Sequence, residues 1–308
     1  MTEMDIYYGK SDVSTYRTYA VPLTGITPIP ESSFSGRSNT LLAASINVRV
    51  LGTAFASAYT DGDNRLVVAT DTMKNFIHRE SLAFTGATLE EWLEFVGRRF
   101  LETYPHMERL RVSGTEIPFE PALVPDGDGG FAESEVLFER RHGDRSTARL
   151  ELDRTDSGVE VTDLSAGRIG LQMMKVTGSA FADFARDAYT TLPERKDRPL
   201  YIHLDVGWKY DSPTTALATD HKAYVAGEQV ADMVGAVFHR FVSLSIQHLI
   251  HEIGQAMLDR WPQLSEVSFE SQNRLWDLSE TAASDERVKV YTDPRPPYGH
   301  LGLVLRRG

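Results

Sequence analysis

Residues 66–75 read Leu-Val-Val-Ala-Thr-Asp-Thr-Met-Lys-Asn and pass from an apolar run into a polar one. The apolar run is typical of a β-strand, and the polar run that follows can open an α-helix. A strand end of this kind presents the Thr70 hydroxyl and the backbone N–H groups of Thr70 and Asp71 where polar groups can meet a ligand. The stretch therefore predicts a strand-to-helix connection with a ligand site beside it.

Strands and helices alternate on both sides of this stretch, as the hydrophobic periodicity indicates. A capping-box-like Thr88-Leu89-Glu90-Glu91 predicts the start of a helix that runs to about residue 104. Another helix is expected over residues 72–84. A hairpin turn is expected at residues 59–64 and a flexible loop at residues 125–130, because both are rich in Gly and Asp. We expect strands over residues 42–58, 65–70, 109–119 and 135–141.

The second half of the chain repeats this order of elements without repeating the residues. One long helix is expected over residues 227–261, where Pro262 stops it. Antiparallel sheets with helices packed on one face are the natural way to bury such elements. The pattern predicts an α+β fold of two tandem units, residues 1–145 and 146–308. The strands expected in the second unit are residues 147–153, 170–176, 200–210, 266–271 and 301–305.

The composition excludes several classes of protein and of site. The chain has 308 residues, of which 41% are hydrophobic and 25% are charged, as in an ordinary globular protein. Its net charge of −12 disfavours non-specific binding to nucleic acid or to an anionic membrane. It contains no cysteine, which excludes disulfides, thiolate nucleophiles and cysteine-ligated metal centres. We expect a cytoplasmic protein, since the N-terminus is polar and the C-terminus carries no Ser-Lys-Leu peroxisomal address.

Two side chains of the first unit could form a proton relay. The motif Tyr8-Gly9-Lys10 provides a lysine, whose amine can act as a general base. A lysine amine hydrogen-bonded to the Thr70 hydroxyl, and thence to water, would move protons without a metal. The plainer interpretation of these residues is a solvated surface lysine and an ordinary strand threonine.

The second unit carries groups that suit a flat anionic ligand. Phe181 offers a face on which a heterocycle can stack, and Arg198 offers a planar fork for two neighbouring acceptors. Gln247, with one acceptor and two donors, can pair with an amide-like edge. A core phenylalanine, a salt-bridged arginine and a polar helix residue are the plainer interpretations.

Several blocks of the chain resemble urate oxidase (uricase) of the bacterial type, in the order of that family. The resemblance implies two tandem tunnelling-fold (T-fold) units per chain and a tunnel-shaped homotetramer with sites between subunits. It also implies that dioxygen and water oxidise urate to 5-hydroxyisourate and hydrogen peroxide, without a metal or an organic cofactor. The blocks are residues 8–16, 66–75, 181–198, 244–248, 269–277 and 290–299.

The same resemblance implies which residues bind the substrate. Arg198 and Gln247 would hold the pyrimidine-side edge of urate, and Phe181 would stack below the ring. Backbone N–H groups would meet the remaining polar atoms. The implied substrate-binding residues are Thr70, Asp71, Phe181, Arg198, Ile246 and Gln247.

The implied catalytic residues are Lys10, Thr70 and Asn273. Lys10 and Thr70 would shuttle protons, and Asn273 would hold dioxygen, a peroxo species or the attacking water. Many uricases have a histidine two residues after this asparagine, where it supports the relay. This chain has Leu275 there, so the third member of the relay differs from the family pattern.

Two other functions fit part of the pattern. A metal-dependent T-fold enzyme acting on a pterin or purine would need a metal site, and His248 and His251 lie about one helical turn apart. Their order matches neither histidine–glutamate motif of the zinc hydrolases, so a place on a helix surface or at an interface is the preferred interpretation. The second alternative is a non-catalytic urate- or purine-binding oligomer, for which Leu275 is the one sequence hint.

Overall fold

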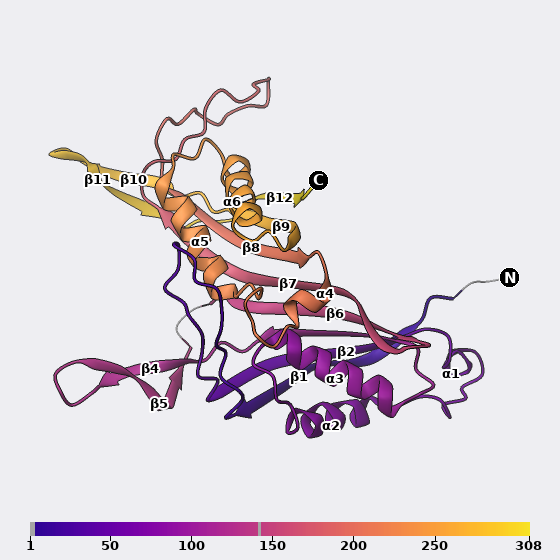
Figure 1. Cartoon of the computed structure of the whole chain (residues 1–308). Coiled ribbons are helices and arrows are strands. Elements are labelled where there is room, and N and C mark those ends of the chain that lie inside the picture. The colour runs from indigo at the N-terminus through magenta and orange to yellow at the C-terminus, as the bar shows by residue number, and fades with distance from the viewer. Residues whose placement is uncertain (1–3, 141–142) are drawn as a thin grey trace. The chain divides into compact units, whose positions relative to one another are not determined.

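A computed structural model of the chain describes residues 4–140 and 143–308. The chain forms two compact units, and each combines antiparallel strands with α-helices (Figure 1), which confirms the predicted α+β class. No helix in the described residues is long and apolar enough to cross a bilayer. Unit 1 consists of Met1–Pro28, Phe34–Gly167 and Lys209–Ala226, and unit 2 of Ile29–Ser33, Arg168–Trp208 and Gly227–Gly308.

Unit 1 is built on antiparallel strands that pair in the order β1, β2, β3 and β6. Alternate residues of the second strand, including Ile46, Val48 and Val50, are buried, as expected of a strand with one covered face. A long strand, β7 (Gly158–Lys175), adjoins β6 and continues into unit 2. The other strands of this sheet in unit 1 are β1 (Tyr7–Thr18), β2 (Leu41–Leu51), β3 (Arg109–Glu116) and β6 (Arg145–Thr155).

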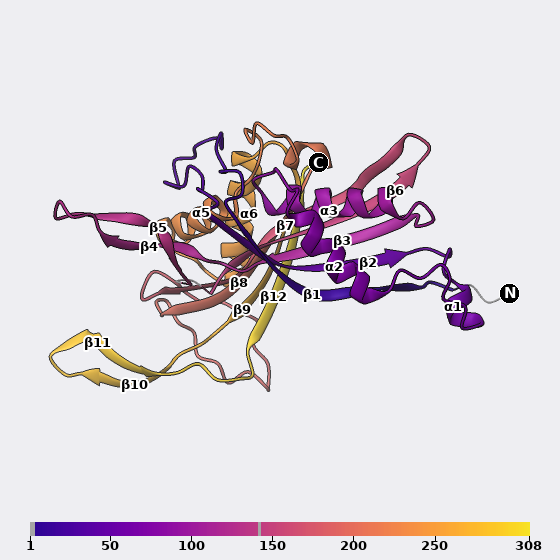
Figure 2. The same cartoon turned by 90° about the horizontal axis from the view of Figure 1, so that it is seen from below.

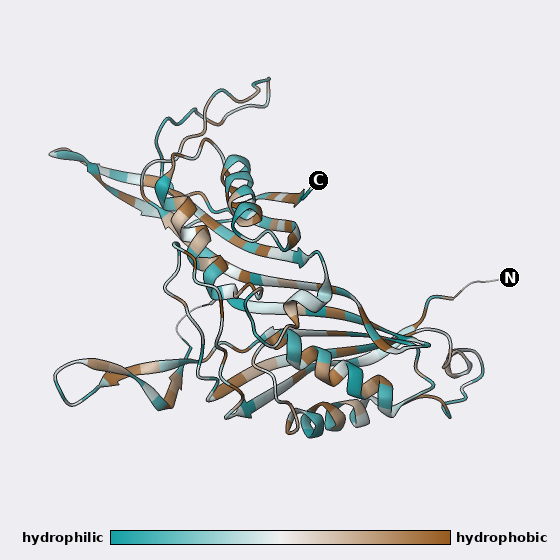
Figure 3. Cartoon of the chain, in the orientation of Figure 1, coloured by the Kyte–Doolittle hydropathy of each residue, from teal (hydrophilic) through white to brown (hydrophobic). Residues whose placement is uncertain are grey.

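Two helices pack on these strands (Figure 2). The first, α2 (Thr70–Ser81), contacts β1, and the second, α3 (Leu89–Thr103), contacts β2, β3 and β6. α3 begins with a capping box, in which the side chains of Thr88 and Glu91 each accept from the other's backbone N–H. Hydrophobic and hydrophilic residues alternate around this helix (Figure 3), and its apolar stripe faces the strands. The fully buried members of the stripe include Trp92, Leu93, Val96 and Phe100.

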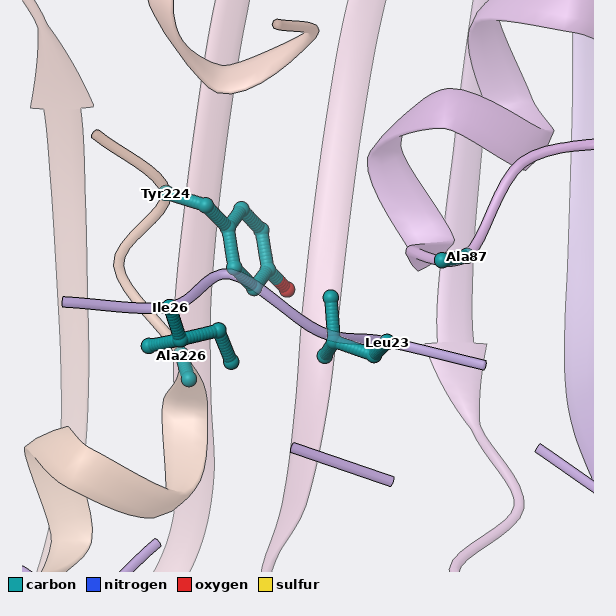
Figure 4. Close-up of a cluster of buried hydrophobic side chains, with 5 residues drawn as sticks. All are labelled: Leu23, Ile26, Ala87, Tyr224 and Ala226. Atoms are coloured by element: carbon teal, nitrogen blue, oxygen red, sulfur yellow. The ribbon is translucent and has the colours of Figure 1, made fainter. Parts of the chain in front are cut away.

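A small apolar cluster of unit 1 joins segments that are distant in the sequence (Figure 4). It contains Leu23, Ile26, Ala87, Tyr224 and Ala226. The segment that contains Tyr224 and Ala226 is thereby held against the N-terminal end of α3. The remaining elements of unit 1 are α1 (Ser57–Thr60), α4 (Pro213–Ala216) and the hairpin of β4 (Glu120–Pro125) and β5 (Phe131–Glu139).

Unit 2 continues with the end of β7, followed in pairing order by β8, β9 and β12. Helix α6 contacts β9, β12 and helix α5. A separate hairpin, β10–β11, extends beyond these strands (Figure 1). The elements are β8 (Leu200–Tyr210), α5 (Gly227–Arg240), α6 (Ile246–Arg260), β9 (Leu264–Asn273), β10 (Asp277–Ala282), β11 (Asp285–Thr292) and β12 (Gly299–Arg306).

Several local predictions are confirmed. The strand at residues 200–210 and the capping-box helix are present as expected. The glycine-rich loop at residues 125–130 joins β4 to β5, and its Gly127 and Gly129 have φ of 89° and 90°, which glycine adopts without strain. The strand expected at residues 135–141 is part of β5, and residue 141 lies outside the described residues.

The predictions of a hairpin turn at residues 59–64 and a strand at residues 65–70 are wrong. α1 occupies the start of the first range, and residues 65–69 are irregular. Their N–H groups bond outside any strand ladder: Val67 N donates to Asn64 O at 3.0 Å, and Val68 N donates to the Tyr8 hydroxyl at 2.9 Å. α2 starts at Thr70, so this threonine opens a helix instead of ending a strand.

The prediction of one helix over residues 227–261 is also wrong, because residues 241–245 separate α5 from α6. The Ser245 side chain ends the break by accepting from His248 N at 3.1 Å, as a helix N-cap does. Apolar residues continue through the break, so the periodicity alone does not reveal it. The strands β1, β4, β10 and β11 were not among the expected elements.

Candidate active site

Lys10 lies on β1 in unit 1, opposite Val48 of β2. The preceding residue allows the two strands to approach closely, since a Cβ added at Gly9 would lie 1.8 Å from the Val48 carbonyl oxygen. The register of β1 shifts directly after Lys10, with Asp12 at a φ of 57° and its N–H donating to Asn47 Oδ1 at 2.8 Å. A bulge of this kind sets the direction of nearby side chains at the strand.

Tyr8 links β1 to the start of α2. Its ring contacts Phe55 edge to face at 4.7 Å between centroids, and its hydroxyl accepts from Val68 N at 2.9 Å. Burial raises the pKa of the Tyr8 phenol above its ordinary value. The Tyr8-Gly9-Lys10 motif therefore holds the irregular segment that leads into Thr70.

Thr70 and Asp71 form the beginning of α2. Ala69 is the N-cap and has no side chain that could accept from the first N–H groups, so these donors remain directed out of the helix end. A hydrogen bond from Lys74 at 2.6 Å lowers the pKa of the exposed Asp71 carboxyl, and the charge of Lys10 adds to this lowering. Unit 1 thus brings Lys10 into the electrostatic neighbourhood of the Thr70–Asp71 helix start.

Phe181 and Arg198 lie together in unit 2. The backbone of Phe181 pairs with that of Arg195 through hydrogen bonds of 2.7 and 2.9 Å, and Arg198 N donates to Ser179 O at 2.8 Å. The Arg198 guanidinium carbon lies 5.4 Å from the centroid of the Phe181 ring. Phe181 also stacks on Phe184 at 4.9 Å, which fixes the orientation of its ring.

The same segment contacts the break before α6. Ala180 N donates to Ser243 O at 2.8 Å, and the buried hydroxyls of Ser243 and Ser179 are 3.0 Å apart. Ile246 and Gln247 are the first residues of α6, where backbone N–H groups have no acceptor within the helix. Unit 2 therefore brings the aromatic ring, the guanidinium and an open helix N-terminus into one site.

Arg198 has no carboxylate partner among the described residues, and its buried Nε has no hydrogen-bond partner. Burial alone lowers its pKa below the ordinary value for arginine. An arginine remains charged even so, and a desolvated cation gains much from a bound anion. The geometry favours a planar anionic ligand that rests on Phe181 and accepts from Arg198.

Asn273 is the last residue of β9 and lies opposite Gly299 of β12. The next residue pairs with β8, because Arg274 N donates to Tyr201 O at 2.9 Å. This register places Asn273 close to the start of β8, which begins two residues after Arg198. Its side-chain oxygen is buried and has no hydrogen-bond partner among the described residues.

The histidine pair of α6 does not form a metal centre with other described residues. No group of three or more histidine, aspartate or glutamate side chains in residues 4–140 and 143–308 is arranged to hold a metal ion. His248 and His251 instead share the exposed carboxylate of Glu252, at 3.9 and 3.5 Å. This arrangement agrees with a place on the helix surface.

Sequence analysis missed the residues that hold this site in place. Ser179 and Ser243 are buried and bonded to each other although they lie far apart in the chain. Asp197 accepts from the Thr177 hydroxyl at 2.6 Å and from Gly178 N at 2.7 Å. The sequence offers only a short polar run before Phe181 as a sign of these contacts, and that run does not reveal which distant residues it bonds to.

Comparison with known proteins shows the family of the chain. The family model for uricase matches residues 41–149 and 164–302. The chain belongs to the uricase family. The uricase of Haloferax volcanii is 45% identical over 302 residues, which cover 98% of this chain and 98% of that protein.

Solved structures of the family share the fold. The crystal structure of urate oxidase from Bacillus sp. TB-90 matches with a TM-score of 0.94 and 45% identity over 98% of this chain and 100% of that chain. This similarity confirms the predicted tunnelling-fold class.

Other uricase relatives are longer. The uric acid degradation bifunctional proteins of Bacillus sp. (strain TB-90) and Bacillus subtilis (strain 168) are 46% and 45% identical to this chain. The chain spans only 59% and 60% of their lengths.

Proposed function

We propose that the chain oxidises urate with dioxygen and water to 5-hydroxyisourate and hydrogen peroxide. The observation that carries this proposal is Arg198, a half-buried cation above the Phe181 ring with no acidic partner among the described residues. Urate is a flat anion, and it supplies both the charge and the ring that this pair can bind. Membership of the uricase family supports the same substrate.

Most of the binding groups lie in unit 2. Phe181 stacks against the ring, and Arg198 and Gln247 hold the pyrimidine-side edge by hydrogen bonds in the ring plane. The open N–H of Ile246 meets a further oxygen or nitrogen of the purine, since the first N–H groups of a helix lack internal acceptors. The N–H groups of Thr70 and Asp71 bind in the same way at the start of α2.

The chemical part of the site moves protons and places oxygen. Lys10 and Thr70 take the proton from urate and pass it to water, which makes the ring electron-rich enough to reduce dioxygen. The Asn273 amide N–H donates to dioxygen, and its unpartnered side-chain oxygen accepts from the attacking water. Two electrons pass from urate to dioxygen, and water then adds its oxygen to the ring while hydrogen peroxide leaves.

We infer that this reaction needs no metal or organic cofactor. The substrate itself provides the electrons, so the protein must only bind, deprotonate and position. Exhaustive chelation should therefore leave the rate of urate oxidation unchanged. Activity that returns only on addition of zinc, iron or copper would instead favour the metal-dependent purine or pterin enzyme.

We also propose that four chains assemble into a tunnel-shaped homotetramer, each with tandem T-fold units over residues 1–145 and 146–308. Lys10 and Thr70 belong to the first unit, whereas Phe181, Arg198 and Gln247 belong to the second. That segregation suits a site made by the first unit of one subunit and the second unit of its neighbour. We place the protein in the cytoplasm, where its partners are urate, dioxygen and other copies of the chain.

The deciding experiment mixes chelator-treated protein with urate and follows ultraviolet absorbance and peroxide together. Loss of urate with an equal amount of peroxide is the expected result. Tight binding of urate without peroxide would favour the non-catalytic purine-binding oligomer.

A further inference from the structure

Lys175, at the end of β7, donates to the C-terminal end of a helix in the same unit. Its ammonium lies 3.0 Å from Phe238 O, 3.4 Å from His239 O and 2.8 Å from Phe241 O. An ammonium has three donors, and these three carbonyl oxygens accept all of them. α5 ends at Arg240, so the lysine joins the last turn of α5 to the first residue after it.

The contact has a clear physical reason. The last carbonyl groups of a helix have no donor within the helix and carry partial negative charge. A glycine in the left-handed conformation often supplies the missing bonds, but Phe241 follows α5 directly. Lys175 supplies both the donors and the positive charge from another element.

Residues 241–245, which we call the corner, are thereby fixed at three points. Lys175 binds Phe241 at the beginning of the corner. In the middle, Ser243 bonds to residues 179 and 180. At the end, the Ser245 side chain caps α6. The position of Ile246 and Gln247 therefore depends on residues 175–180 of the preceding segment.

The same short segment also positions Arg198. Asp197 accepts from the Thr177 hydroxyl and from Gly178 N, and Arg198 N donates to Ser179 O. A single stretch thus holds the guanidinium on one side and the helix start on the other. A purine edge that bonds to both the Arg198 guanidinium and the start of α6 can be bound only if the distance between these two groups is kept.

We propose that Lys175 is a positioning residue for purine recognition: by binding the end of α5 it sets the corner, and the corner sets Gln247 relative to Arg198. Lys175 does not touch the ligand in this scheme. The inference rests on the proposed urate site.

The test compares Lys175→Met with Lys222→Met, which removes a lysine that is mostly exposed beside Asp220. Affinity is measured for a xanthine-like purine that the site cannot oxidise, together with KM and kcat for urate. We expect Lys175→Met to weaken the purine affinity and raise KM by about tenfold or more, with kcat changed by less than about threefold. The Lys222→Met protein should resemble the wild type.

A double-mutant cycle separates positioning from general damage to the fold. If Lys175 acts through the start of α6, the loss of purine affinity in the Lys175→Met/Gln247→Ala protein should be clearly smaller than the sum of the two single losses. Additive losses would overturn the proposal. If Lys175→Met does not fold, Lys175→Gln carries the same cycle, since its amide can still donate to one carbonyl.

Hydrogen exchange provides a readout independent of activity. The amides of Ala180, His248 and Leu249, which donate to Ser243 and Ser245 of the corner, should exchange faster in Lys175→Met than in the wild type, whereas those in the middle of α5 should not change. Unchanged exchange at these three amides would overturn the positioning role even if the enzyme is active. Failure of the wild-type protein to oxidise urate would overturn the proposed function and leave the exchange result to decide on Lys175.

Discussion

At the scale of single residues, Arg198 differs from the arginines that stabilise the sheet of unit 1. Arg109 and Arg111 of β3 pair with Asp153 and Glu151 of β6, at 2.7 and 2.6 Å. Arg198 is more desolvated and has no such partner among the described residues, which costs free energy unless a ligand provides the anion. The cost is consistent with a binding residue and is difficult to reconcile with a purely structural one.

This contrast predicts that binding and chemistry can be separated by mutation. Arg198→Ala and Gln247→Ala should each weaken urate binding by roughly 1–3 kcal/mol, because each removes contacts to the purine edge. Lys10→Met and Thr70→Ala should instead lower kcat while leaving the affinity for an inert xanthine-like purine nearly unchanged. Steady-state kinetics and calorimetric titration measure the two effects. The division of roles is wrong if both pairs of variants behave alike.

A second residue-scale prediction concerns Glu90, which is 3% exposed on α3 and accepts from the Tyr224 hydroxyl at 3.2 Å. Burial raises the pKa of Glu90 from 4.5 to about 7. The folded state therefore binds this proton more tightly than the unfolded chain does. The resulting stabilisation is complete below the unfolded pKa and is lost as the pH rises to about 7.

Glu90→Gln should remove this pH dependence, because the amide does not titrate and can still accept from Tyr224. Relative to the wild type, the variant should gain stability as the pH rises, by roughly 2–4 kcal/mol above neutral pH. Urea unfolding at acidic and at mildly alkaline pH measures the difference. The matched control is Glu102→Gln, on the same helix but about half exposed. A constant offset between Glu90→Gln and wild type would refute the account.

At the scale of elements, the approach of β1 to β2 depends on one glycine. Gly9→Ala would place a Cβ 1.8 Å from the Val48 carbonyl oxygen, a distance at which the backbone must move. We expect β1 to separate locally from β2, with loss of the Tyr8–Val68 hydrogen bond and of most urate oxidation. Gly235→Ala in α5 is the matched control, since its Cβ would meet open space. The control should be neutral or stabilised by up to about 1 kcal/mol. Thermal unfolding and urate oxidation are measured for both variants. A Gly9→Ala protein as stable and as active as the wild type would contradict the prediction.

Elements whose own residues carry the signals for their start and their buried face were predictable from the sequence. α3 carries its own capping box, and β8 alternates buried and more exposed residues along its whole length. Residues 65–69 resemble a strand in sequence but are irregular. Their Val68 N–H donates to the hydroxyl of Tyr8, which belongs to a distant segment, and not to a neighbouring strand. The corner before α6 was not predictable either, because Ser179 and Lys175 fix it from the end of β7 and beyond.

At the scale of the whole molecule, the proposed site residues could be named from the sequence, whereas the residues that support them could not. Lys10, Thr70, Phe181, Arg198 and Gln247 have chemistry that suits urate and stand in blocks that resemble the family. The residues that hold them act through tertiary contacts, which sequence spacing does not reveal. Function was therefore easier to predict than the geometry that makes it possible.

The assignment of site residues to separate units leads to a prediction about assembly. If one site takes Lys10 and Thr70 from one subunit and Phe181, Arg198 and Gln247 from its neighbour, a subunit damaged in one part can still supply the other. Lys10→Met and Arg198→Ala proteins should each be nearly inactive alone. Unfolded together and refolded as mixed oligomers, they should regain activity.

The expected recovery follows from random pairing of the two variants. A site is intact only when its first part comes from Arg198→Ala and its second part from Lys10→Met, which is about a quarter of all sites if they act independently. Each variant refolded alone controls for gain of activity during refolding. Subunit exchange is verified by mass spectrometry of the oligomers. Proven mixing without recovery would mean that each chain builds its site alone, because every chain in the mixture then carries one of the two lesions.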